Sequence, residues 1–273
     1  MKNKTRDGYY QTKTPLFKVP VVFNPNVEVI IGEKQPYEGL LNSIAFKQTT
    51  AGGDIYPIYS TNDFRLFFRL VNLYEALRKI SPQYFERNFP PSDDESLAMA
   101  ETIKVWMNEN AFPIMLHGYE YNRTDGYIPS NLKNCYEVIS TSDRTPSIIQ
   151  ASQFMQSLIY IVEISGFAEG KFDHNIEDYY HYYHGRVELS FDRVNPIYYA
   201  EDVFAAVKAQ VLLFPPLKDR WVTCKNCGEH FYQTHGHQQY CDKLDCNPHT
   251  HYNKSEKGIV RNKKAKAKKE GES

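Results

Sequence analysis

Four of the five cysteines lie within the last fifty residues of the 273-residue chain, and they form two pairs. Two residues separate Cys224 from Cys227, four separate Cys241 from Cys246, and thirteen lie between the pairs. Paired cysteines at this spacing are typical of structural zinc sites, in which four thiolates surround one ion tetrahedrally. The sequence therefore predicts one structural Zn²⁺ whose ligands are Cys224, Cys227, Cys241 and Cys246.

The residues around the pairs support this prediction. Gly228 directly follows Cys227, where the chain must turn sharply to aim two thiolates at one point, and glycine tolerates a positive φ there. Large side chains next to the ligands would form the apolar core of a miniature domain, namely Trp221, Phe231, Tyr232 and Tyr240. A zinc held by four protein thiolates has no open position for water, so the site is predicted to be structural and not catalytic.

Nearby histidines leave the ligand set open, because imidazole is also an ordinary zinc ligand. They are His230, His235, His237, His249 and His251. Four cysteines are favoured because both pairs are complete, and His249 is the best placed substitute. Disulfides are the weaker alternative, because the chain opens with Met-Lys-Asn-Lys-Thr, has no apolar signal peptide and carries few cysteines. Reduced thiols and a cytoplasmic location are therefore predicted, with the isolated Cys135 as a small buried hydrophobe.

Residues 217–269 resemble the C-terminal zinc fingers of bacterial CGNR-type proteins, and equally those of related uncharacterised bacterial zinc-finger proteins. The resemblance rests on the Cys224–Cys227 pair, the aromatic pair Phe231-Tyr232, the step Tyr240-Cys241-Asp242, Cys246 and the basic segment after it. The chain has Asn247-Pro248-His249 where the CGNR family has Gly-Asn-Arg, and its first pair is closer together than is usual there. The resemblance implies zinc binding, DNA binding and a role in transcriptional regulation.

The segment after the second pair is basic. It carries Lys254, Lys257, Arg261, Lys263, Lys264, Lys266, Lys268 and Lys269 against Glu256, Glu270 and Glu272. This local excess of five positive charges stands in a chain whose formal net charge is −1, so charge is segregated towards one end. Lysines that neutralise phosphates release counterions, which favours nucleic-acid binding. The predicted contacts are Lys254, Lys257, Arg261, Lys263, Lys264 and Lys266, and a merely solubilising terminus is the alternative.

A second polar cluster lies between His174 and His184. On a helix, His181 and His184 would share a face and Asp178 would lie one turn before His181, which permits a metal site or acid–base chemistry. A partly buried helix face or a protein interface is the favoured interpretation, because histidine and tyrosine are amphipathic. The sequence contains none of the common phosphate-loop, nucleophile-elbow or His-Glu-x-x-His motifs. No catalytic residue is assigned, and the balance is against an enzyme.

Apolar periodicity predicts four helices in residues 13–216, the body that precedes the finger. The first spans 61–80, and the second begins at the Ser92–Glu95 capping box and stops near Pro113. The third begins at Thr145 or Pro146 and runs to Ile164, with Gly166 just beyond its end. The fourth spans 197–214 and stops at Pro215-Pro216, which marks the boundary with the finger.

The strand signals are fewer. Apolar runs at 16–23 and 27–31, separated by Asn24-Pro25-Asn26, predict two strands paired in a small antiparallel sheet, and alternation predicts strands within 118–138 and 186–191. Residues 32–60 are predicted to be irregular and residues 1–12 to be disordered. The predicted fold class is mainly α with a minor β component, an α+β domain at 13–216 followed by a zinc finger at 217–253 and a basic tail at 254–273.

Three functions remain open from the sequence. The favoured one is a bacterial zinc-finger protein that binds nucleic acid, DNA before RNA, while the body senses a ligand, forms a homo-oligomer or binds a protein partner. The second is a finger that serves folding or protein docking without nucleic acid. The third is an enzyme that acts on nucleic acid through the His174–His184 stretch. No apolar run reaches the roughly 18 residues that span a bilayer, so no membrane partner is predicted.

Overall fold

The chain divides into two compact units, Met1–Pro215 and Pro216–Ser273. Along the chain, the division lies between Pro215 and Pro216. The computed structural model describes residues 2–4, 10–12, 15–22, 25–34, 39–49, 54–87, 89–113, 148–167, 187–192 and 195–246. The predicted strands within 118–138, the His174–His184 stretch, Cys135 and the basic tail lie outside these described residues.

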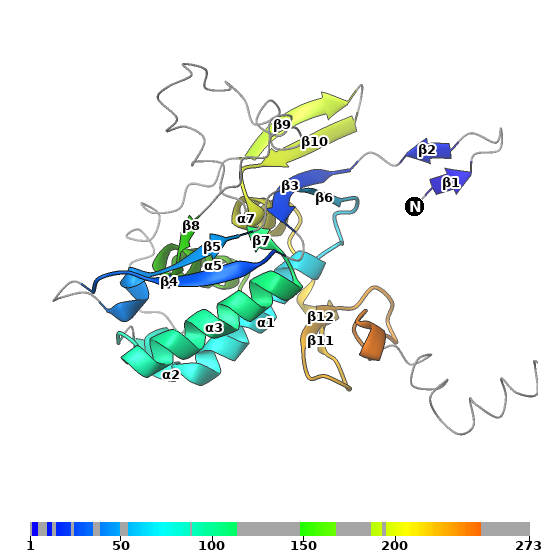
Figure 1. Ribbon diagram of the computed structural model, residues 1–273. Helices are drawn as coiled ribbons and strands as arrows, with labels where there is room; N and C mark the ends of the chain where they lie inside the picture. Colours follow the sequence, from blue (N-terminus) through cyan, green and yellow to red (C-terminus); the bar gives the residue numbers. More distant parts are fainter. Residues whose placement is uncertain are drawn as a thin grey trace, which may run out of the picture. The chain divides into compact units, whose positions relative to one another are not determined.

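The described part of the first unit contains five α-helices and two main sheets (Figure 1). The helices are α1 (Arg65–Ile80), α2 (Pro82–Arg87), α3 (Asp93–Glu109), α5 (Ala151–Ile164) and α7 (Val203–Leu213). Helices and sheets both contribute substantially to this unit, so the chain has a mixed α/β fold. None of the described helices combines the length and apolar character that a bilayer crossing requires.

The larger sheet has five strands and joins distant parts of the chain. Its strands are β3 (Phe17–Val22), β6 (Asp54–Ile58), β7 (Phe112–Pro113), β9 (Val187–Asp192) and β10 (Asn195–Ala200). The order along the sheet is β6-β3-β10-β9, and β7 pairs with β3. Only the β3–β10 pairing is parallel, with Tyr198 opposite Phe17, whereas the other described pairings are antiparallel.

The second sheet is three-stranded and antiparallel throughout. It contains β4 (Val27–Ile31), β5 (Ile44–Gln48) and β8 (Ile148–Gln150), in that order. A 3₁₀ turn, η1 (Leu40–Ser43), leads into β5. Near the N-terminus, β1 (Lys2–Lys4) and β2 (Tyr10–Thr12) form a separate antiparallel pair within the segment that was expected to be disordered.

Local sequence signals set the helix ends. The Ser92 side chain accepts a hydrogen bond from the Glu95 backbone N–H, and the Glu95 carboxylate accepts one from the Ser92 N–H, which confirms the predicted capping box of α3. The Asp202 carboxylate caps α7 by accepting from the Ala205 N–H at 2.8 Å. Gly166, with φ of 69°, follows α5 and ends it as predicted.

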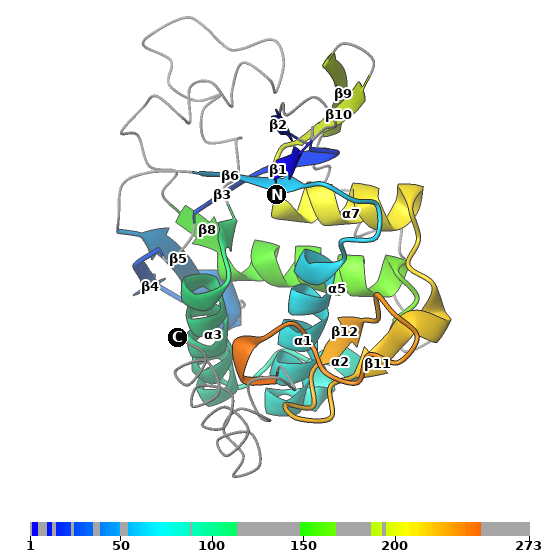
Figure 2. The same ribbon diagram turned by 90° about the vertical axis from the view of Figure 1, so that its right-hand side faces the viewer.

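The core of the body lies where helices from three regions of the sequence meet. Figure 1 shows α1 and α3 side by side, and Figure 2 shows α5 between α7 and α1. The ring of Phe154 lies 6.3 Å from Phe46, 6.1 Å from Trp106 and 5.1 Å from Phe204, centroid to centroid. The Trp106 indole N–H donates to the Arg69 carbonyl at 3.1 Å and so links α3 to α1.

Several sequence expectations need correction. Strands are present at 17–22 and 27–31, but β3 and β4 belong to different sheets and do not pair with each other. Residues 32–60 are not irregular throughout, because they contain β5 and β6. The third and fourth helices begin later than predicted, because the residues before them form β8 and β10. The predicted strand at 186–191 is confirmed as β9.

Candidate metal centre

A short β-hairpin forms the start of the described C-terminal unit. After the 3₁₀ turn η3 (Lys218–Arg220), β11 (Trp221–Thr223) pairs antiparallel with β12 (His230–Tyr232). The register places Val222 opposite Phe231, and both pack against the buried cysteines together with Tyr240. Because side chains alternate across a strand, Trp221 and Tyr232 occupy the other face of the hairpin. Sequence reasoning thus found Phe231 and Tyr240, missed Val222, and placed Trp221 and Tyr232 in a cluster that does not contain them.

The turn between the hairpin strands carries the first cysteine pair. The Cys224 N–H donates to the Glu229 carbonyl at 2.8 Å, and the Gly228 N–H donates to the Cys224 carbonyl at 2.9 Å. Gly228 has φ of 75°, the left-handed conformation that glycine adopts with least strain. These bonds fold residues 224–229 back on themselves, so both thiols of the pair can face the same point.

A backbone hydrogen bond joins the segment of the second pair to that of the first. The Lys225 N–H donates to the Gln239 carbonyl at 3.0 Å, two residues before Cys241. Cys246 ends the 3₁₀ turn η4 (Leu244–Cys246), where its N–H donates to the Lys243 carbonyl at 2.9 Å. The short helical turn brings the last cysteine back towards the other three.

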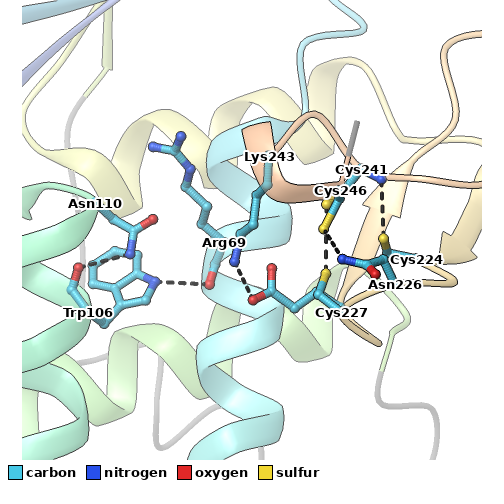
Figure 3. Close-up of polar contacts among 10 residues, drawn as sticks. Arg69, Trp106, Asn110, Cys224, Asn226, Cys227, Cys241, Lys243 and Cys246 are labelled. Atoms are coloured by element: carbon cyan, nitrogen blue, oxygen red, sulfur yellow. Dashed lines mark hydrogen bonds and ion pairs between the residues drawn. The ribbon is translucent and has the colours of Figure 1, made fainter. Parts of the chain in front are cut away.

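The four sulfurs converge on one point (Figure 3). All lie within 4.8 Å of one another, and Cys227 Sγ is 3.7 Å from Cys241 Sγ. This separation is too long for a disulfide, which requires about 2.05 Å. It matches the edge of about 3.8 Å expected for a tetrahedron of sulfurs at about 2.3 Å from a central zinc. The donor set and its dimensions therefore fit a single zinc ion.

The environment of the four thiols is uneven. Cys224, Cys241 and Cys246 are buried, whereas Cys227 is exposed. The Cys224 sulfur accepts from the Cys241 N–H at 3.4 Å, and the Cys246 sulfur accepts from the Asn226 side-chain amide at 3.4 Å (Figure 3). Burial opposes ionisation of Cys224, but N–H groups of Cys227, Cys241 and Asn226 outweigh it and lower the Cys224 pKa to about 6. Burial raises the pKa of Cys227 and Cys241.

An ion pair joins the two halves of the site. Lys243, between the cysteines of the second pair, donates to the carboxylate of Glu229, which follows the first pair. Burial opposes the charge of Lys243, but this hydrogen bond and the nearby negative charges, that of Glu229 first, raise its pKa. The pair adds a side-chain link between the two cysteine loops.

The histidines considered as alternative ligands are not part of the cluster wherever they are described. His230 lies 3.4 Å from the Thr223 hydroxyl through its Nδ1, and His235 and His237 are exposed in the loop before Cys241. Among the described residues, the group able to hold a metal consists of the four cysteines. His249 and His251, like the six basic residues predicted to contact nucleic acid, lie outside the described residues.

Comparison with known proteins adds no family assignment. No family model matches the chain, no curated protein matches it, and no solved structure matches it. Of the features shared with bacterial CGNR-type zinc fingers, the structure shows the four-cysteine cluster.

Proposed function

We propose that the C-terminal unit is a structural zinc finger and that the basic segment after it binds nucleic acid. The observation that carries the proposal is the convergence of the Cys224, Cys227, Cys241 and Cys246 sulfurs within 4.8 Å of one another. Four thiolates occupy all four positions of a tetrahedral zinc, which leaves none for water or substrate. The ion would therefore hold the chain in shape and would not take part in a reaction.

The small size of the finger's core supports a metal-dependent fold. Its buried cluster consists of Phe231 and three of the four cysteines, with Val222 and Tyr240 partly buried against it. Such a cluster excludes too little apolar surface to offset the entropy of ordering the segment. In comparable metal-dependent domains the binding free energy of the ion supplies the missing stability, about 10–16 kcal/mol for zinc-finger peptides at pH 7.

The charge distribution supports nucleic acid as the partner of the basic segment. Residues 216–246 contain four basic and four acidic side chains and are balanced. Residues 247–273 contain eight basic and three acidic side chains, so attraction to a polyanion would come from this segment. The finger would fix the position of Cys246, the residue that directly precedes this segment in the sequence.

The finer assignment follows the resemblance to bacterial CGNR-type fingers. It favours DNA before RNA and a cytoplasmic regulator of transcription, in which the body binds a ligand, a protein or a second copy of the chain. Cysteine thiolates hold zinc only while they are reduced, which agrees with a reducing compartment. The alternative is a finger that docks a protein partner and does not bind nucleic acid. Titration with nucleic acid at several salt concentrations distinguishes the two functions.

Metal analysis tests the zinc site. Full-length protein purified under reducing conditions is expected to carry about one zinc per chain, and Cys241→Ser should reduce this severalfold because three ligands hold the ion much more weakly. Cys135→Ser is the matched control and should retain the metal, because the other four cysteines already complete the proposed tetrahedral ligand set. Wild-type protein without zinc would contradict the proposal, as would a Cys241→Ser variant with its full metal content.

Salt-dependent binding tests the nucleic-acid role. We expect the full-length protein to bind mixed-sequence duplex DNA at about 50 mM salt with an affinity that falls steeply as salt rises. Lys263→Gln/Lys264→Gln should weaken binding and make the slope of log K against log salt shallower by about 2, since each phosphate contact contributes about 0.9. Lys47→Gln/Lys79→Gln removes two exposed lysines of the body and should leave the slope unchanged.

The outcomes separate the alternatives. A parallel titration with single-stranded RNA shows whether DNA is preferred. Failure of the wild-type protein to bind either nucleic acid at about 50 mM salt would favour a protein-docking finger, since phosphate contacts are strongest at low salt. Equal slopes for the two double variants would show that Lys263 and Lys264 do not contact phosphates.

A further inference from the structure

The side chain of Asn226 connects the two cysteine pairs. Asn226 lies between Cys224 and Cys227 in the first turn, but its side-chain nitrogen Nδ2 is 3.4 Å from the sulfur of Cys246, twenty residues later. The same nitrogen is 3.4 Å from the backbone carbonyl oxygen of Asp245. Figure 3 shows the amide directed at the sulfur from the opposite loop.

The two contacts differ in strength. A distance of 3.4 Å suits an N–H···S hydrogen bond, because sulfur is larger than oxygen, whereas it is long for N–H···O, which is normally below about 3.2 Å. The contact with Cys246 is therefore the stronger one. An N–H directed at a thiolate stabilises its negative charge and fixes the direction of the sulfur lone pairs, as other donors around metal ligands do.

Cys246 depends on protein donors because it is almost fully shielded from water, with 2% of its surface exposed. Cys224, exposed to the same extent, receives the backbone N–H of Cys241 at 3.4 Å. For Cys246, a side chain supplies the hydrogen bond. Replacement of Asn226 can therefore remove this donor without changing a metal ligand or the backbone.

We propose that Asn226 is a positioning residue of the zinc site, whose amide orients and stabilises the Cys246 thiolate as a ligand. This inference rests on the proposed zinc site, which must exist for Asn226 to tune it. Partners of metal ligands typically contribute a factor of about 10–100 to metal affinity. Asn226 would thus determine how tightly the finger retains its ion.

The test compares two Asn226 variants with a matched control in the full-length reduced protein. Asn226→Ala removes the donor, and Asn226→Asp replaces the amide by a carboxylate of nearly the same shape that repels the thiolate. Gln239→Glu makes the same change from amide to carboxylate on an exposed side chain of the same unit, and it keeps the Gln239 backbone carbonyl that accepts from the Lys225 N–H. Zinc affinity is measured by competition with a chromophoric chelator, and the site is also loaded with Co²⁺ to record its thiolate-to-cobalt charge-transfer band.

Both Asn226 variants are expected to bind zinc about 10–100-fold more weakly than wild type, while Gln239→Glu stays within about twofold. The charge-transfer band of Asn226→Ala should move to lower energy, because a thiolate that has lost a hydrogen bond donates electrons more readily. A purely structural effect of the substitution would weaken binding without moving the band.

The results distinguish this inference from the proposed function. If wild-type protein binds no zinc, the zinc site itself is wrong. If wild-type protein binds zinc and both Asn226 variants bind it equally well, the site stands and the role of Asn226 is refuted. Weaker binding with an unshifted cobalt band also refutes it, because the donor would then not act on the sulfur.

Discussion

Different interactions stabilise the interior of each of the two units of this chain. In the body, Phe154 packs against Phe46, Trp106 and Phe204, and many further aliphatic and aromatic side chains are fully buried. In the C-terminal unit, the buried cluster consists of Phe231 and three cysteines. The body can therefore be stabilised by apolar packing, whereas the finger has too little apolar surface for that.

This difference shows how composition sets the source of stability. Packing in the body is distributed over many contacts, so one substitution removes only part of the stability. In the proposed finger four sulfur atoms share one ion, so loss of the ion would remove its central link at once. The finger should consequently unfold when zinc is removed, whereas the body should lose stability when its apolar core is changed.

Zinc removal is expected to have the largest effect. Incubation of the reduced full-length protein with a strong chelator should unfold the finger, because about 10–16 kcal/mol of binding free energy is withdrawn. Hydrogen-exchange mass spectrometry should show lost protection in residues 221–246, including the amides of Cys224, Gly228 and Cys246 that are hydrogen-bonded in the folded unit. Peptides from α1 should keep their protection, since no residue in the described part of the body belongs to the cysteine cluster.

If residues 221–246 kept their protection from hydrogen exchange after complete zinc removal, the finger would be stable through packing alone. The proposed difference in stabilisation between finger and body would then be wrong. Reloading with zinc is the control and should restore the original exchange pattern. Loss of protection in α1 would show that the body also depends on the ion.

A core substitution in the body is expected to have the next largest effect. Phe154→Ala removes a ring that contacts three other aromatic side chains and should lower the free energy of unfolding of the body by about 3–5 kcal/mol. Denaturant unfolding monitored by helical circular dichroism measures this change. The zinc content of the variant should stay at the wild-type value, because the finger does not depend on the ring.

Leu97→Ala provides the control, because Leu97 lies on α3 but is 38% exposed. It should change stability by no more than about 0.5 kcal/mol. If Phe154→Ala also released the zinc, the two units would not be independent in stability. A change below about 1 kcal/mol would mean that the aromatic cluster is not the centre of the core.

The same contrast explains which features the sequence could predict. The cysteine cluster and the Ser92–Glu95 capping box follow from residues only a few positions apart, or from pairs whose spacing is itself the signal. The pairing of β3 was mispredicted, because its parallel partner β10 comes from about 180 residues later along the chain. Alternation of apolar and polar residues along the sequence predicts that a strand is present. It does not indicate which distant strand pairs with it.

Two other errors have physical causes. β8 and β10 stand directly before α5 and only two residues before α7, so apolar residues of strand and helix form one uninterrupted signal. Short apolar runs do not distinguish strand from helix by periodicity. The contact of Asn226 with the sulfur of Cys246 could not be predicted from the sequence, because asparagine is common in turns and Cys246 lies twenty residues away.

The smallest predicted effect concerns a half-buried acid in the body. The finger buries thiols at a site that suits a cation, whereas burial of Glu163 on α5 raises its carboxyl pKa from 4.5 to about 7. The folded protein thus holds this proton more tightly than the unfolded chain does. As pH rises from about 4.5 to about 7, the unfolded chain gives up its proton first, so stability is lost across this window and stays at the lower level above it.

Glu163→Gln should remove this loss. Because part of the side chain remains in water, we expect the variant to be more stable than wild type by only about 1–2 kcal/mol at pH 8 and nearly equal to it at pH 4.5. Denaturant unfolding at the two pH values measures the difference. Glu33→Gln, at an exposed position, is the control for the loss of one carboxylate. An equal effect of Glu163→Gln at both pH values would show that the folded body does not raise the pKa of Glu163, because only a pKa difference between the folded and unfolded states makes the effect depend on pH.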